Sequence, residues 1–334
     1  MVLRVLAAPD KFRGTADAIE VSDAIAAGVT AAGCKAIQVP MADGGEGTLD
    51  ALGGANRSSL VVGPLGKPVE ATWRLNRETA VIEMAKASGL LMAGGPKANR
   101  PLDATTYGTG ELIRYAAEGG AQQIIIGMGG SATTDGGLGA IRAMGPLDRY
   151  RNLELLVACD VKTYFLDAPK VFAPQKGATE AEVDLLSRRM KRLEQIYKNK
   201  YGVRVGELSG GGAAGGLAGG LAAIGATLVS GIDLVAERLS LDKLIEDADL
   251  VITGEGKLDS SSFHGKVVGG VAAYAKAASV PLVVVAGEVV SGIEEKVEAV
   301  SLVETFGEKK SLQHTLFCIQ EVVSRWLQER KLHL

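Results

Sequence analysis

Acidic, basic and glycine-rich segments recur along the chain, and each follows an apolar run that is predicted to be a strand. They read APD, MADGGEG, GMGGSATTDGG, ACD, TGEGKLD and AGE. Carboxylates can hold Mg²⁺ or accept a hydroxyl proton, whereas lysines and exposed backbone N–H groups neutralise phosphate oxygens. Phosphoryl transfer needs this combination of groups, so the loops predict that chemistry.

The candidate residues supply three kinds of group. The acids are Asp10, Asp43, Glu46, Asp135, Asp160, Glu255 and Asp259. The cations are Lys11, Arg13, Lys176, Lys257 and Lys266. The third kind is flexible backbone and hydroxyl groups, at Gly129, Gly130, Ser131 and Thr133.

The segment Ile124–Gly137 is the densest of these loops. Three isoleucines lead into glycines, small hydroxyls and one aspartate. Backbone N–H groups and hydroxyls at a strand end form nests for anions, so we expect a carboxylate or a phosphate to bind here. Asp135 would repel an anion, and its expected partner is therefore Mg²⁺ or a hydroxyl group.

Several other kinds of chemistry are disfavoured. The three histidines, His264, His314 and His333, have no H-E-x-x-H spacing, which argues against a zinc hydrolase. Two weak dinucleotide fingerprints begin at Gly127 and Gly210, and they keep a nicotinamide-dependent hydroxy-acid dehydrogenase as the enzymatic alternative. The first fingerprint is followed by further glycines where its helix should continue, and each glycine destabilises a helix by about 1 kcal/mol relative to alanine.

The net charge of −3 and the absence of a basic tract exclude nucleic acid as an expected partner. Three cysteines without C-x-x-C spacing are typical of reduced thiols, and we expect a cytoplasmic protein. The uncharged segment Leu208–Ile232 is too rich in glycine for a spanning helix, so we expect a buried helix there and no membrane partner.

Both ends of the chain alternate between strand and helix patterns, which predicts a parallel α/β unit. The helix near the N-terminus is expected to begin after Thr15 as N-cap and to end at Gly33. Near the other end, 247–253 predicts a strand and 254–259 a glycine turn. Ligands in open α/β sheets bind beyond the carboxyl ends of strands, where these polar loops are placed.

The middle of the chain has a different pattern. Residues 58–90 alternate polar and apolar side chains with turns between them, as in β-hairpins, and 178–202 predict a long charged helix. We therefore expect one α/β domain built from both chain ends, with a second domain inserted.

The segments that carry these motifs resemble the bacterial type 1 glycerate kinase family, in order from about residue 5 to residue 330. They include APDKFRGTADAIEVSDAIAAGV, VPMADGGEGTLDAL, TTYGTGELI, GMGGSATTDGGLGA and DLVITGEGKLDSSSFHGK. The resemblance implies phosphorylation of D-glycerate with ATP and Mg²⁺. It also implies a flavodoxin-like or Rossmann-like parallel-sheet domain from 1–60 and 245–334, an inserted mixed α/β domain from 61–244, and an active site between them.

The resemblance suggests roles for the candidate residues. Asp160 or Asp259 would accept the alcohol proton, Lys176 would contact the transferred phosphoryl group, and Asp135 with Asp160 would hold Mg²⁺. The residues expected to bind glycerate or nucleotide are Asp10, Lys11, Arg13, Asp43, Glu46, Gly129, Gly130, Ser131, Thr133, Glu255, Lys257 and Lys266.

The chain also departs from the family pattern. Arg13 replaces a lysine, KTYFLDAP replaces an Asn-Pro-Leu run, and the region 142–155 is shortened. These departures keep a catalytically impaired sugar-acid-binding protein as the non-enzymatic alternative. The sequence does not fix which glycerate hydroxyl is phosphorylated, which carboxylate is the base, or the oligomeric state, for which a homodimer is one alternative.

Overall fold

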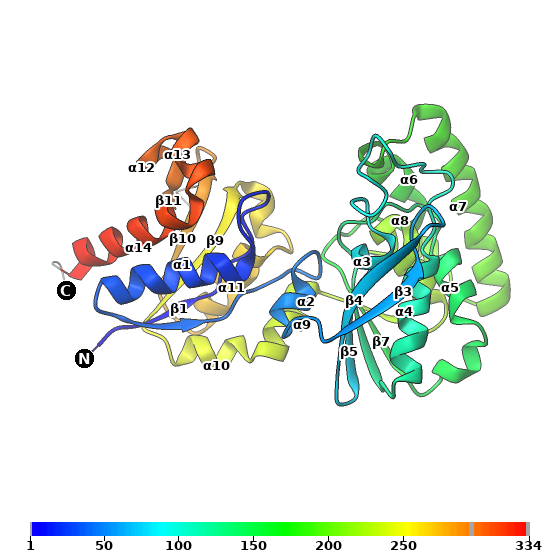
Figure 1. Ribbon diagram of the computed structural model, residues 1–334, viewed down its shortest axis with the longest axis horizontal. Coiled ribbons are helices and arrows are strands. Elements are labelled where there is room, and N and C mark those ends of the chain that lie inside the picture. The colour runs from blue at the N-terminus through cyan, green and yellow to red at the C-terminus, as the bar shows by residue number, and fades with distance from the viewer. Residues whose placement is uncertain (1, 294–296, 332–334) are drawn as a thin grey trace. The chain divides into compact units, whose positions relative to one another are not determined.

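The computed structural model describes residues 2–293 and 297–331. The chain divides into two compact units. Unit 1 comprises Met1–Asp43, Asp50–Leu52 and Ile232–Leu334, and unit 2 comprises Gly44–Leu49 and Gly53–Gly231. Both ends of the chain thus contribute to unit 1, and unit 2 is inserted between them (Figure 1).

Unit 1 contains a five-stranded parallel sheet. Its strands are β1 (Arg4–Ala7), β2 (Lys35–Gln38), β9 (Leu250–Leu258), β10 (Leu282–Val289) and β11 (Glu298–Ser301). Their order is β11-β10-β9-β1-β2, and every neighbouring pair is parallel. Numbered within the unit, this is the flavodoxin-like order 2-1-3-4-5, with its switch point between β1 and β9.

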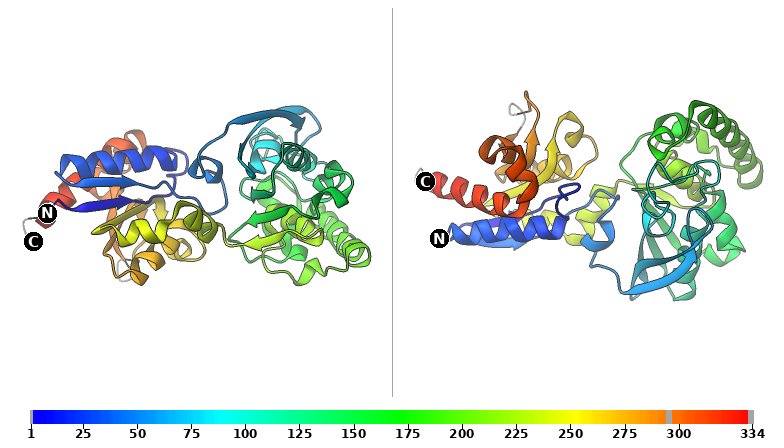
Figure 2. Two further views of the ribbon diagram at one scale, coloured as in Figure 1. Left: turned by 90° about the horizontal axis from the view of Figure 1, so that it is seen from below. Right: turned by 45° about the horizontal axis from the view of Figure 1, so that its top comes forward.

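Helices cover both faces of this sheet, because successive strand residues point to opposite sides. In β1, Val5 contributes to a core with α1 (Ala18–Ala31) and α14 (Thr315–Lys331), whereas Leu6 joins α9 (Gly231–Leu239), α10 (Leu241–Glu246) and α11 (Val267–Ala277). Figure 2 shows α1 and α14 side by side. Two short helices, α12 (Leu302–Phe306) and α13 (Glu308–Gln313), precede α14.

Unit 2 contains a six-stranded mixed sheet. Its strands are β3 (Arg57–Val62), β4 (Pro68–Asn76), β5 (Thr79–Glu83), β6 (Gln123–Gly127), β7 (Glu154–Ala158) and β8 (Thr227–Val229), in sequence order. The first three are antiparallel neighbours, as the hairpin pattern predicted, and the rest are parallel. Its helices are α3 (Ala85–Ser88), α4 (Tyr107–Glu118), α5 (Leu138–Met144), α6 (Ala168–Phe172), α7 (Glu180–Tyr201) and α8 (Ala213–Ala223), and the short helix α2 (Thr48–Ala51) has residues in both units.

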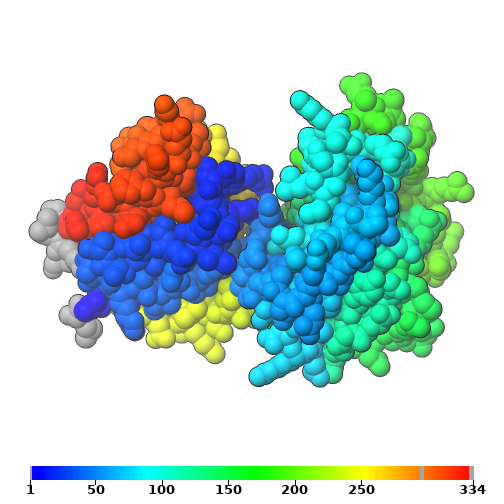
Figure 3. Space-filling model, in the orientation of Figure 1, coloured from blue at the N-terminus to red at the C-terminus, as the bar shows by residue number. Residues whose placement is uncertain are grey.

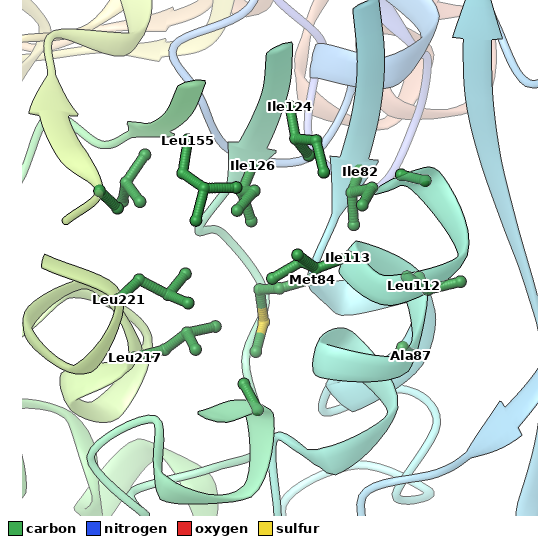
Figure 4. Packing of buried hydrophobic residues seen from close by; sticks show 14 of the residues in the cluster. Ile82, Met84, Ala87, Leu112, Ile113, Ile124, Ile126, Leu155, Leu217 and Leu221 are labelled. Carbon is green, nitrogen blue, oxygen red and sulfur yellow. The ribbon is translucent and has the colours of Figure 1, made fainter. Parts of the chain in front are cut away.

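The core of unit 2 is aliphatic and lies between the sheet and its helices. Figure 4 shows Ile82 and Ile126 from the strands near Met84, with Leu217 and Leu221 of α8 opposite them. These five residues are all fully buried. The long helix predicted over 178–202 is confirmed as α7, which begins at a capping box formed by Thr179 and Glu182.

The expectation of one buried helix over Leu208–Ile232 was wrong in extent. α8 covers only Ala213–Ala223, and its first turn is distorted by left-handed residues at Ala214, Gly215 and Gly216. A Cβ atom on Gly215 would lie 1.9 Å from the Thr133 carbonyl oxygen. The close approach of another loop therefore overrides the local helical preference, and the segment ends in β8.

Two further local predictions were wrong. The N-cap of α1 is Asp17 and not Thr15, because Asp17 and Glu20 form a reciprocal capping box. The glycine turn expected at 254–259 is largely strand, since β9 continues to Leu258 beside β10. Glycine at position 287 permits this pairing, because a Cβ atom there would lie 2.4 Å from the Gly256 carbonyl oxygen.

Among the helices of residues 2–293 and 297–331, none has the length and apolar character needed to span a membrane.

Candidate active site

A pocket of about 610 Å³ lies in unit 1, where the loop after β1 meets the ends of β9 and β10. The strand order reverses between β1 and β9, and open α/β sheets bind ligands at such a point. The structure brings eight of the sequence-predicted residues to this one pocket. They are Asp10, Lys11, Arg13, Asp43, Glu255, Lys257, Asp259 and Lys266.

Two hydrogen bonds with backbone groups fix Asp10 in the loop just after β1. Its N–H donates to the Gly254 carbonyl over 2.8 Å, and its Oδ1 accepts the N–H of Lys11 over 2.7 Å. The Lys11 ammonium lies 3.7 Å from the same oxygen. Burial raises the pKa of Asp10, Lys11 opposes that shift, and Asp43 adds to it.

Glu255 is a buried carboxyl group within β9, with 7% of its surface exposed. Burial raises its pKa to about 7, and a hydrogen bond with Ser262 and the charge of Lys266 act in the opposite direction. Its Oε1 atom has no hydrogen-bond partner among the residues that the structure describes. A buried acceptor without a donor is costly, so this position favours a protonated carboxyl group or a bound donor.

The cations of the pocket are not equivalent. Lys257 lies 3.2 Å from Glu288 in an exposed ion pair. Arg13 and Lys266, in contrast, have no ion-pair partner within the described ranges. The Nζ atom of Lys266 donates to the Ser261 hydroxyl over 2.8 Å.

Asp259 caps the short 3-10 helix η5 (Ser260–Phe263) at the rim of the pocket. Its Oδ1 accepts the Ser261 hydroxyl over 2.6 Å and the Ser261 N–H over 2.8 Å. These bonds lower the pKa of Asp259, the hydroxyl bond most. A lowered pKa makes this carboxylate a weaker base.

Unit 2 holds a second group of predicted residues around Lys176, which ends the 3-10 helix η3 (Pro174–Lys176). Lys176 is buried, and its Nζ donates to the Ser131 hydroxyl over 2.8 Å and to the Thr133 carbonyl over 2.7 Å. Asn99 ties the same two segments together by donating to the carbonyls of Ala132 and Lys176. Burial lowers the pKa of Lys176 to about 7, and the charge of Asp135 opposes that shift.

Asp135 is surrounded by donors of its own unit. Its Oδ2 accepts the Thr106 N–H and hydroxyl, both over 2.8 Å, and the Gly139 N–H over 3.2 Å. Its Oδ1 accepts the Gly137 N–H and the Thr106 hydroxyl, each over 3.1 Å. Because N–H and O–H donors occupy both oxygens, this carboxylate does not fit a metal ligand as it stands and instead joins the starts of α4 and α5.

Asp160 lies after β7, where its Oδ1 accepts the Ser230 hydroxyl over 3.1 Å and the Gly231 N–H over 3.0 Å. These partners stand where the chain passes from unit 2 to unit 1. Within the described parts of the chain, no three His, Cys, Asp or Glu side chains are placed to hold a metal ion. Mg²⁺ usually takes only one or two carboxylates together with phosphate oxygens, so Asp160 stays a predicted contact.

The glycine loops of unit 2 lie against each other. The Met128 N–H donates to the Gly44 carbonyl over 2.9 Å, and a Cβ atom on Gly129 would lie 2.7 Å from the Cα of Gly45. Gly130 has a left-handed φ of +71°, and Glu46 is exposed. The predicted residues Glu46, Gly129 and Gly130 are thus neighbours, brought together by backbone contact.

Sequence reasoning missed Glu83, which holds one of these loops. Glu83 ends β5, is 2% exposed, and its Oε1 accepts the N–H groups of Gly47 and Leu49, each over 2.9 Å. The available signal was an acid directly after an apolar run, as in the segments that were selected. The same reasoning missed Leu302, Val303 and Leu312, which line the pocket of unit 1.

The fingerprint at Gly127 lacks the structure that dinucleotide binding needs. After β6 the chain forms a loop around Lys176, and α5 begins only at Leu138. In the Rossmann fingerprint the glycine turn opens directly into a helix whose N-terminus faces the pyrophosphate. The loop is therefore unlike the phosphate turn of a nicotinamide-binding fold.

Comparisons with known proteins agree with one another. The sequence model of the glycerate kinase family matches residues 5–148 and 146–329. A glycerate kinase from Bacillus subtilis (strain 168) is 41% identical over 328 residues, 86% of this chain and 85% of that protein. A glycerate 2-kinase from Escherichia coli (strain K12) is 40% identical over 331 residues, 87% of each. A crystal structure of the protein assigned as glycerate kinase 2 in Salmonella typhimurium LT2 has a TM-score of 0.83 and 33% identity, and the match covers 100% of this chain and 99% of that one.

Proposed function

The chain belongs to the glycerate kinase family, and we propose that it transfers the γ-phosphoryl group of ATP to a hydroxyl group of D-glycerate. It is then a phosphotransferase with an alcohol as acceptor. The structural observation that carries the proposal is the gathering of eight predicted polar residues around one pocket at the switch point of unit 1. The three free cysteines agree with the cytoplasmic location that we propose for the reaction.

Transfer would proceed in line, as the alcohol oxygen forms a bond to the γ-phosphorus and ADP departs. A carboxylate accepts the alcohol proton, and Asp160 and Asp259 are the proposed candidates. The lowered pKa of Asp259 makes it the weaker base of the two candidates and favours Asp160 for this role. Mg²⁺ enters with ATP in this proposal and supplies positive charge beside the phosphate oxygens.

Lys176 is proposed to act on the phosphoryl group through the loop that it holds. Its Nζ is already bonded to Ser131 and Thr133, so its immediate effect is to fix the backbone of that loop. A loop fixed in this way presents its N–H groups without reorganisation, which is how preorganised donors stabilise developing charge. The predicted anion of this loop is a carboxylate or a phosphate.

An assay that couples ADP release to a colour change tests the proposal directly. We expect saturable ADP release that requires both ATP and D-glycerate, with L-glycerate as the matched control. Saturable binding of D-glycerate without ADP release would instead identify the impaired sugar-acid-binding protein. Oxidation of D-glycerate with NAD⁺ would identify the dehydrogenase.

A ³¹P spectrum of the product completes the assignment. Phosphate esters at the 2- and 3-hydroxyl couple to different numbers of protons, so a single spectrum distinguishes them. Asp160→Asn and Asp259→Asn, measured in the same assay, identify the base. Loss of general-base catalysis typically lowers kcat by about 10²–10⁴-fold, and we expect that loss for Asp160→Asn.

A further inference from the structure

We propose that the pocket of unit 1 is the nucleotide site, with the purine base on the apolar wall formed by α12 and α13 and the triphosphate facing Arg13 and Lys266. This inference rests on the proposed kinase function and deepens it, because it states which substrate the pocket takes and adds residues that sequence motifs do not reveal. Size, chemical character and charge each support it.

The size of the pocket fits a nucleotide better than a three-carbon acid. Its volume of about 610 Å³ falls within the range of roughly 300–1,000 Å³ that is usual for ligands of drug size. Glycerate would leave most of this space to solvent. A nucleoside triphosphate can span the pocket from the loop after β1 to the helices that follow β11.

The lining of the pocket combines apolar and cationic side chains. Leu302 and Val303 of α12 and Leu312 of α13 belong to the lining; Leu302 is buried, whereas Leu312 has 58% of its surface exposed. An exposed leucine in the lining of a pocket offers apolar surface that a base can cover, because burial of apolar area is favourable. Figure 3 shows α12 and α13, in orange, on the surface of unit 1 beside the loop after β1, in blue.

The lining also offers positive charge. Arg13 and Lys266 line the pocket and have no carboxylate within ion-pair distance in the described part of the chain. Lys266 is also the N-cap of α11, whose first turn has no acidic residue and no side-chain cap. The N–H groups of this helix end and the lysine therefore favour phosphate at the same place.

Lysines offset the charge of two pocket acids, because Asp10 is paired with Lys11 and Glu288 is paired with Lys257. Asp43, Asp259 and Glu308 also line the pocket. Burial of the Glu255 carboxyl raises its pKa to about 7, which reduces negative charge beside the phosphates. The N-terminus of α1, in contrast, is already closed by Asp17 and Glu20, so we place no phosphate there.

Calorimetric titration of the full chain separates the two ends of the ligand. The probes are Mg·ATP, Mg·tripolyphosphate, which lacks the base, and D-glycerate. For Leu312→Gln we expect the Kd of Mg·ATP to rise about fivefold or more, while the Kd of tripolyphosphate and of D-glycerate stays unchanged. For Lys266→Gln we expect weaker binding of both Mg·ATP and tripolyphosphate.

Leu316→Gln is the matched control, because Leu316 is an exposed leucine at the start of the next helix, α14, and does not line the pocket. It should bind all three probes like the wild type. The inference is overturned if Leu312→Gln and Leu316→Gln bind Mg·ATP equally well, or if Leu312→Gln weakens D-glycerate in place of ATP. Failure of the wild type to release ADP would overturn the proposed function itself, and the two failures are therefore distinguishable.

Discussion

Lys266 in unit 1 was predicted from sequence to bind glycerate or nucleotide, and Lys176 in unit 2 to contact the transferred phosphoryl group, yet the surroundings of these two lysines differ. Lys266 lines an open pocket and lacks an ion-pair partner in the described ranges. Lys176 is 3% exposed and donates to two oxygens of a neighbouring loop. The same side chain is thus available to a ligand in one unit and already bonded in the other.

The acids show the same contrast. Glu255 in unit 1 has a buried oxygen without a partner in the described residues, whereas both oxygens of Asp135 in unit 2 accept hydrogen bonds. A polar network in which every group is hydrogen-bonded fixes the backbone around it. A network with an unbonded buried group is a place where a ligand can gain binding free energy by supplying the missing hydrogen bond. Unit 1 therefore offers binding groups, and unit 2 offers a rigid loop scaffold.

The comparison can be measured unit by unit, because the chain has two tryptophans, Trp73 in unit 2 and Trp326 in unit 1. A chain with Trp326→Phe reports the unfolding of unit 2 alone, and a chain with Trp73→Phe reports that of unit 1. Urea denaturation followed by fluorescence then gives a separate unfolding free energy for each unit.

The largest expected effect is that of Asp135→Ala on unit 2. The variant leaves the N–H groups of Thr106, Gly137 and Gly139 without their acceptor, at about 1–3 kcal/mol for each donor that stays unbonded. We expect the unfolding free energy of unit 2 to fall by about 3–5 kcal/mol. Asp259→Ala in unit 1 is the matched control and should cost about 1 kcal/mol, the value of a lost cap. Equal losses in the two units would contradict the contrast.

The next effect concerns Lys176 and pH. Its pKa is about 7 in the folded chain and about 10.4 when unfolded, so between these values the unfolded chain binds one more proton. Stability of unit 2 therefore rises with pH in this window, by about 1.4 kcal/mol per pH unit from this group. We expect Lys176→Met to lack that slope between pH 7.5 and pH 9.5, as measured by urea denaturation with Trp73 as the reporter.

Lys191→Met, at an exposed position of α7, is the control for this experiment and should keep the wild-type slope. If Lys176→Met and Lys191→Met give parallel curves, Lys176 ionises as it would in water, and the contrast between the units loses its electrostatic part.

Much of this contrast lies beyond what the sequence can predict. The strand-to-loop pattern at each chain end placed Asp10 and Lys11 correctly after β1, because a parallel α/β pattern is a local signal. The sequence also indicated an inserted domain that begins with hairpins. It could not show that Lys176 is enclosed, since burial depends on which distant loops close over a side chain.

Local sequence patterns also gave wrong predictions of secondary structure where tertiary contacts determine the backbone conformation. Gly254 and Gly256 suggested a turn, but β10 pairs with the segment because position 287 is glycine too. Ala214 and Gly215 suggested a regular helix, but the Thr133 loop occupies the space that a helix would need. Leu312 gave no signal, because an apolar residue that faces a ligand looks the same in sequence as one that faces a core.

The smallest expected effect is that of Glu255→Gln in unit 1, and its sign is opposite to that of Lys176. The pKa of Glu255 is about 7 when folded and about 4.3 when unfolded, so between these values the folded chain binds more protons and stability falls as pH rises. The groups that act on this carboxyl are Ser262, Lys266, Asp10 and Asp259. With Trp326 as the reporter, we expect the unfolding free energy of Glu255→Gln to lose this decline and to exceed that of the wild type by about 1–2 kcal/mol at pH 8.

Glu288→Gln, at an exposed position of β10, is the control, and its unfolding free energy should decline with pH like that of the wild type. If Glu255→Gln shows the same decline as the wild type, the Glu255 carboxyl does not cause it. The contrast between Glu255 in unit 1 and the fully hydrogen-bonded Asp135 in unit 2 would then be lost.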